Sequence, residues 1–172
     1  MSGMAQPAPR IEVKLLDPRL TAWGLPRYQS AHAAAIDLHA CLDAPLTLAP
    51  EDKPALIPAG FSLYIGDPAI AALILPRSGL GHRQGLVLGN LVGLIDPDYT
   101  GPIMVSAWNR NPPGGETITL APGERFAQMV FVPVLRPDFS IVTAFSGATE
   151  RGGGGFGSTG RGSEGRGSAG SG

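Results

Sequence analysis

Short apolar stretches alternate with polar residues along most of the chain. Ile11, Val13 and Leu15 are separated by Glu12 and Lys14, and this period of two is typical of a strand with one buried face. Similar stretches recur, and turn residues separate them at the spacing typical of sandwiches and barrels. The pattern therefore predicts an all-β fold, a jelly-roll-like β-barrel. The expected strands are residues 11–15, 36–40, 46–48, 55–58, 61–65, 71–75, 86–88, 94–95, 103–105, 117–120, 125–134 and 139–145.

Two places interrupt this pattern. The pair Ala59-Gly60 separates the apolar residues 55–58 from residues 61–65 and indicates either a hairpin or a bulge. Residues 78–84 follow an apolar strand, and they are the one segment in which we expect a helix.

The composition changes near the C-terminus. From Gly147 onward the chain contains no Leu, Ile or Val, and residues 152–172 contain 11 Gly and 4 Ser. Such a segment cannot bury enough apolar surface to offset its chain entropy. We therefore expect four parts: a flexible N-terminus at 1–9, a β domain at 10–146, a C-terminal arm with a Gly-rich motif at 147–160, and a disordered Gly/Ser tail at 161–172.

Composition and charge argue against several partners. Hydrophobic residues make up 43% of the chain and the formal net charge is -1, which gives no electrostatic case for binding nucleic acid or an anionic membrane. The apolar run 69–75 is too short to span a bilayer, and the first ten residues lack a secretory signal. The single cysteine, Cys41, suits a reducing compartment and is favoured as a small core residue. We therefore expect a cytoplasmic protein.

Polar residues suited to chemistry interrupt the apolar stretches between residues 76 and 110. Asp96 follows an apolar strand and fits either a turn or a catalytic carboxylate. Arg77 is suited to phosphate or is a surface cation. Asn90 carries the donor and acceptor groups that suit a nucleobase edge, or is a turn residue. Tyr99 can pack its ring on a sugar or fill the edge of the core.

Two further polar residues lie in expected strands. Asp37 stands between Ile36 and Leu38, where it is either solvent-facing or the partner of a Mg²⁺ ion that carries a polyphosphate. Gln128 lies in a core strand, so its amide should be hydrogen-bonded to backbone or to a ligand.

Five stretches, taken in order, resemble the five motifs of the homotrimeric dUTPases, most closely the bacterial form. They are AAAIDLHA at 33–40, PRSGLG at 76–81, GNLVGLIDPDYTG at 89–101, GERFAQMVFVPV at 123–134 and RGGGGFGSTG at 151–160. The resemblance implies a trimer of jelly-roll subunits with shared sites. It implies hydrolysis of dUTP to dUMP and pyrophosphate by water attack on the α-phosphate. That activity limits uracil incorporation into DNA and supplies dUMP for dTMP synthesis.

The resemblance also implies a role for each candidate residue. Asp96 corresponds to the residue that activates the attacking water, and Asp37 to the residue that holds Mg²⁺ through water. The base and sugar are assigned to Asn90, Leu94, Ile95, Tyr99 and Met104. The phosphates are assigned to Arg77, Ser78, Gly79 and Gln128. The closing arm is assigned to Arg151, Phe156, Gly157, Ser158 and Thr159.

One departure and two alternatives accompany this interpretation. Ala35 stands where the family usually has Gly, so added bulk lies next to Asp37. A dCTP deaminase of the same fold is one alternative, but Asn90 and Tyr99 fit uracil better. A non-catalytic nucleotide-binding regulatory trimer is the other, and it would lack Asp96 or the arm motif, which are both present.

Overall fold

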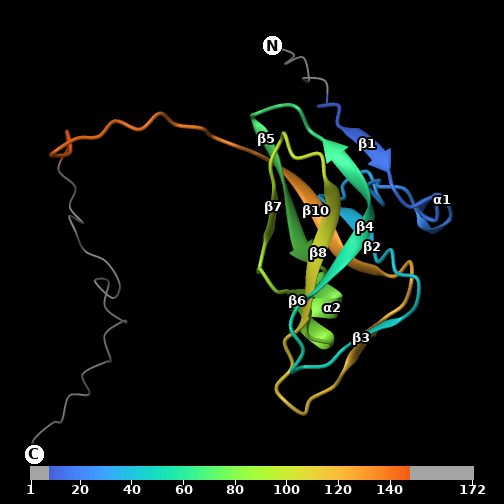
Figure 1. Ribbon diagram of the computed structural model, residues 1–172. Helices are drawn as coiled ribbons and strands as arrows, with labels where there is room; N and C mark the ends of the chain where they lie inside the picture. The colour runs from blue at the N-terminus through green and yellow to red at the C-terminus, as the bar shows by residue number, and fades with distance from the viewer. Residues whose placement is uncertain (1–7, 148–172) are drawn as a thin grey trace, which may run out of the picture. The chain divides into compact units, whose positions relative to one another are not determined.

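The computed structural model describes residues 8–147 (Figure 1). The chain divides into two compact units, residues 1–136 and 137–172. All the helices and strands described lie in the first unit. Ten strands and two short helices make this unit nearly all β, so the predicted fold class is confirmed.

Three antiparallel sheets contain all ten strands. The first sheet has the order β1 (Glu12–Leu15), β4 (Ala55–Tyr64), β8 (Pro102–Asn109), β6 (Leu86–Leu88). The second has the order β2 (Ile36–His39), β10 (Arg125–Pro133), β5 (Ile70–Pro76), β7 (Gly93–Ile95). A two-stranded sheet pairs β3 (Leu46–Leu48) with β9 (Ile118–Leu120).

One hydrophobic core joins the inner faces of these sheets. Along β8, buried Ile103, Val105 and Ala107 alternate with the less buried Met104 and Ser106. Successive side chains of a strand point to opposite faces, so this alternation turns Met104 outward. Side chains from the second sheet, such as Leu38, Ile74 and Met129, belong to the same core cluster.

Strand β4 is continuous and carries a bulge, so of the two alternatives expected at Ala59-Gly60 the bulge forms and the hairpin does not. Its pairing with β8 shifts between Pro58 and Ser62, and Gly60 has a φ of +80°. The Gly60 carbonyl accepts hydrogen bonds from the amides of Leu16 and Asp17, at 2.8 and 2.9 Å. The bulge is therefore held open by the end of β1, and glycine supplies the left-handed conformation that it needs.

Cys41 packs against this bulge, where a Cβ on Gly60 would overlap its Sγ. The thiol is buried, and burial raises its pKa to about 11. A thiol with such a pKa is almost entirely protonated near neutral pH and is a poor nucleophile. The environment supports the predicted core role.

Of the two helices, α2 (Ser78–Arg83) was predicted and α1 (Leu20–Trp23) was not. An ion pair between the Arg19 guanidinium and Asp17, at 2.6 Å, precedes α1. The same guanidinium lies 4.9 Å from the centre of the Trp23 ring. These contacts and the burial of Leu20 stabilise a single turn that has no helical periodicity in its sequence.

The strand expected at 139–145 is wrong. Residues 137–147 contain no strand or helix, and Phe139, Ile141 and Phe145 are 90%, 101% and 91% exposed. A strand needs a hydrogen-bonded neighbour, and no described strand pairs with this segment. The apolar residues that suggested the strand are therefore left in solvent.

Candidate active site

Asp96 directly follows β7 in a turn that is held from two sides. The amide of Tyr99 donates to the Asp96 carbonyl at 3.2 Å, and the amide of Gly66 donates to the Pro97 carbonyl at 2.9 Å. The second bond ties the turn to the connection between β4 and β5. These bonds fix the backbone from which the Asp96 carboxylate projects.

A hollow of about 150 Å³, here called the Tyr99 hollow, lies on one side of this turn. It is lined by Leu94, Ile95, Asp96, Tyr99, Pro102 and Met104. The Tyr99 hydroxyl donates to the Pro102 carbonyl at 3.0 Å, which fixes the orientation of the ring. Five residues predicted to bind base, sugar or water therefore meet in one place.

Asn90 does not line this hollow. It is exposed in the connection between β6 and β7, where the Val92 amide donates to its carbonyl at 2.8 Å. Leu91, next along, has a φ of 65°, which is uncommon for a residue other than glycine. Because Asn90 is exposed in this constrained turn, its side chain is accessible to a ligand.

A second hollow of about 240 Å³, here called the Arg77 hollow, gathers the other predicted residues. It is lined by Asp37, Arg77, Ser78, Gly79, Leu80, Arg83 and Gln128. Asp37 and Gln128 are directly opposite each other on β2 and β10. The Gln128 side-chain amide donates to the Pro76 carbonyl at 2.8 Å, which fixes the chain immediately before Arg77.

Asp37 forms ion pairs with two arginines. Its Oδ1 lies 3.1 Å from Nε of Arg77, and its Oδ2 lies 3.0 Å from a terminal nitrogen of Arg125. Arg77 also donates to the Arg125 backbone carbonyl at 2.9 Å. Arg125 was missed in the sequence. The signal available in the sequence was the pair Phe126-Ala127, two successive apolar residues that break the alternation of the strand, and both are buried in the structure.

His39 is buried two residues beyond Asp37 on β2. Burial lowers the pKa of His39. The carboxylate of Asp37 acts in the opposite direction and raises the pKa, whereas the cations of Arg125 and Arg77 lower it further. The imidazole is therefore neutral near pH 7. The fixed charges of this region come from the arginines and Asp37.

The two hollows lie at opposite ends of β5. Ile95, beside Asp96, pairs with Ala72 near the start of β5, whereas Pro76, beside Arg77, ends it. Arg77 is five positions after Ala72, which corresponds to about 16 Å of extended strand. One chain therefore holds the predicted water-activating and phosphate-binding groups far apart.

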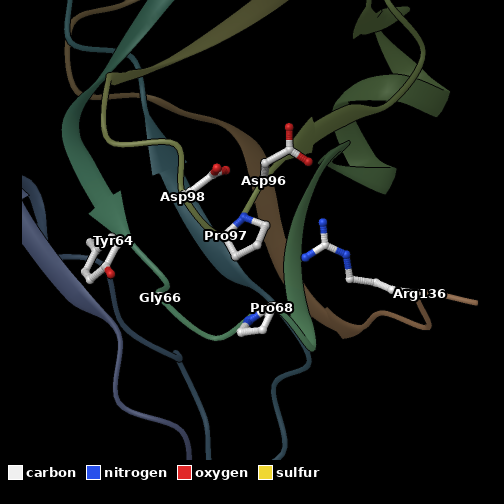
Figure 2. A pocket seen from close by; sticks show the side chains of 7 residues that line it. All are labelled: Tyr64, Gly66, Pro68, Asp96, Pro97, Asp98 and Arg136. Carbon is white, nitrogen blue, oxygen red and sulfur yellow. The ribbon is translucent and has the colours of Figure 1, made fainter.

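Asp96 also lines a third hollow, of about 390 Å³ (Figure 2). It is lined by Tyr64, Gly66, Pro68, Asp96, Pro97, Asp98 and Arg136. Figure 2 shows the guanidinium of Arg136 reaching toward this hollow from the side opposite Tyr64. None of the residues predicted from the sequence except Asp96 belongs to it.

The family model for dUTPase matches residues 21–160 of the chain. The chain belongs to the dUTPase family. Among curated relatives, it is 60% identical to the deoxyuridine 5'-triphosphate nucleotidohydrolase of Methylibium petroleiphilum, over 87% of this chain and 96% of that protein. It is 57% identical to the protein of the same name from Azoarcus sp. strain BH72, over 87% of this chain and 97% of that protein.

A solved structure resembles this member of the dUTPase family in fold. The dUTPase of Staphylococcus bacteriophage 80alpha, solved with dUPNHPP, superposes with a TM-score of 0.76 at 26% identity, covering 88% of this chain and 99% of that one. The predicted family is confirmed by these matches. The predicted arm residues Arg151, Phe156, Gly157, Ser158 and Thr159 lie outside the described residues.

The dUTPase family is metal-dependent in general. Among residues 8–147, no three His, Cys, Asp or Glu side chains gather in a way that would hold a metal ion. Both oxygens of Asp37 contact guanidinium nitrogens, and two cations beside the carboxylate oppose the approach of a third. The Arg77 hollow therefore does not fit direct ligation of Mg²⁺ by Asp37.

Both helices in the described part of the chain are too short to span a membrane.

Proposed function

We propose that this chain is a dUTP diphosphatase, which hydrolyses dUTP to dUMP and pyrophosphate. The observation that carries the proposal is the position of Asp96, which is fixed at the edge of the Tyr99 hollow beside the ring of Tyr99. The relatives named as deoxyuridine 5'-triphosphate nucleotidohydrolases support the substrate. The products imply a role in limiting uracil incorporation into DNA and in supplying dUMP for dTMP synthesis.

Asp96 acts as the general base. Its carboxylate orients a water molecule and accepts a proton as the water oxygen bonds to the α-phosphorus. The bond from that phosphorus to the bridging oxygen breaks, and pyrophosphate leaves on the side opposite the attacking water. The backbone bonds around Asp96 limit its movement, which helps to keep the water and the phosphorus in reacting geometry.

The Tyr99 hollow binds the nucleoside. Tyr99 packs beneath the deoxyribose, Met104 contacts the substrate, and Asn90 hydrogen-bonds uracil together with the backbone at Leu94 and Ile95. The left-handed conformation of Leu91, with a φ of 65°, constrains the turn that presents Asn90 and so supports this role.

The Arg77 hollow binds phosphates through Arg77, Ser78, Gly79 and Gln128. Guanidinium groups suit phosphate because they donate parallel hydrogen bonds and stay charged. The arm completes the site through Arg151, Phe156, Gly157, Ser158 and Thr159. We propose Mg²⁺ as the metal. Bound to the triphosphate of the substrate, it would offset part of the negative charge of the phosphates.

The site is shared between subunits of a homotrimer. Within one chain, the connection that contains Asn90 leads into β7 at Gly93. Gly93 pairs with Ile74 of β5. This end of β7 is therefore nearer to Arg77 than the end that leads to Asp96. A nucleotide with its base at Asn90 and its α-phosphate at Asp96 therefore extends away from the Arg77 of its own chain. A neighbouring subunit must supply the phosphate-binding set.

The proposal assigns roles to parts of the chain. We assign residues 10–146 to the β domain and residues 147–160 to the arm that closes over the substrate, and we assign no function to residues 1–9 and 161–172. We place the enzyme in the cytoplasm, where its single cysteine needs no partner.

Product analysis tests the reaction directly. The purified chain should release pyrophosphate and dUMP from dUTP in the presence of Mg²⁺, and no ammonia from dCTP. Ammonia release from dCTP without pyrophosphate from dUTP would establish a deaminase instead. Tight binding of dUTP without either product would establish a regulatory binding protein.

A further inference from the structure

We propose that Asp37 is a positioning residue that holds Arg77 and Arg125 as a pair of phosphate-binding guanidinium groups, and that Arg125 is a further substrate-binding residue. This inference rests on the proposed function, because it concerns the triphosphate of the same site. It gives Asp37 a role that requires no contact with the metal.

A β-bulge turns Arg125 toward Asp37. In the pairing of β10 with β2, Arg125 is opposite His39 and Ala127 is opposite Leu38, so Phe126 is the extra residue. Residues directly opposite each other share a face of the sheet. Arg125 therefore lies on the face of His39 and Asp37, whereas unbroken alternation from Gln128 would place it on the core face.

The burial of the three side chains fits a carboxylate beneath two cations. The Asp37 side chain is only 13% exposed, whereas those of Arg77 and Arg125 are 31% and 48% exposed. Each carboxylate oxygen already contacts one guanidinium. Both oxygens of the carboxylate are thus engaged in contacts within the protein. The guanidinium groups are more exposed and can meet a ligand from the solvent.

The charge and the free donors of this group suit an anion. Two guanidinium groups and one carboxylate carry a formal charge of +1. Arg77 uses Nε and one terminal nitrogen on protein oxygens, and Arg125 uses one terminal nitrogen on Asp37. The remaining N–H groups of both side chains can donate to phosphate oxygens, whose geometry they match.

The test measures affinity for dUPNHPP, whose imido bridge resists hydrolysis, by calorimetry with Mg²⁺ and with EDTA. Arg125→Gln should weaken binding by about tenfold, the loss expected for one charge-assisted contact. Asp37→Asn should weaken binding by a similar factor with Mg²⁺ and with EDTA, because both arginines lose their orientation. The affinity of Arg125→Gln should also depend less steeply on salt, since one screened charge is gone.

Arg27→Gln is the matched control, since it removes an exposed arginine outside the Arg77 hollow. It should leave the affinity unchanged. Unchanged affinity in Arg125→Gln, or a loss in Asp37→Asn that appears only with Mg²⁺, would overturn the inference, and the second result would establish a metal-linked Asp37. Melting temperature and molar mass in solution verify each variant, and Arg125→Gln alone decides if Asp37→Asn does not fold. Failure of the unchanged chain to hydrolyse dUTP would instead refute the proposed function.

Discussion

Replacement of Asp96 by Asn should reduce dUTP hydrolysis by about 10²–10⁴-fold, the usual contribution of a general base. The amide keeps the shape of the carboxylate but cannot accept the proton of the attacking water. The ring of Tyr99 and the turn around Asp96 should be unaffected, because the turn is held by backbone hydrogen bonds. Affinity for dUPNHPP should therefore change little.

Single-turnover hydrolysis and calorimetry measure the two halves of this expectation. Asp98→Asn is the matched control, because Asp98 is two residues away and lines the Arg136-containing hollow of Figure 2 but not the Tyr99 hollow. It should keep near-normal turnover. Turnover of Asp96→Asn within twofold of the unchanged chain would remove Asp96 from the chemistry.

Removal of residues 151–172 should lower turnover by about 10²-fold, since an arm that closes over a site excludes water and completes the catalytic geometry. The resemblance assigns this role to Arg151 and Phe156, which would contact the γ-phosphate and the base. The β domain should remain intact, because the helices and strands described all lie before residue 137.

A second truncation provides the control for the arm. Removal of residues 161–172 alone should leave turnover unchanged, since that tail has no apolar residue larger than alanine. The molar mass in solution should remain that of a trimer for both truncations. Equal loss of turnover in both would assign a function to the tail, and no loss in either would show that the arm is dispensable.

Local sequence patterns predicted most of the described fold. The apolar run at residues 103–105 predicted part of β8, and Gly60 marked the bulge of β4. The amphipathic pattern failed at residues 139–145, because apolar alternation identifies a potential strand without identifying its partner. It also missed α1, which depends on contacts among Asp17, Arg19 and Trp23.

The candidate site shows the same limit. Motif order predicted Asp96 and Tyr99, which meet in one hollow, and Arg77 and Asp37, which meet in another. The distance between the hollows follows from sheet register, which no single motif contains. Arg125 was missed because a bulge decides which face its side chain takes.

Co-expression of two inactive variants tests the shared site most directly. Asp96→Asn leaves the Arg77 hollow intact, and Arg77→Gln leaves the Tyr99 hollow intact. If each site takes Asp96 from one subunit and Arg77 from the next around the ring, random mixed trimers should recover roughly a quarter of the normal activity. Activity no greater than that of the separate variants, in a preparation where mixed trimers are demonstrated by differently tagged chains, would contradict the account.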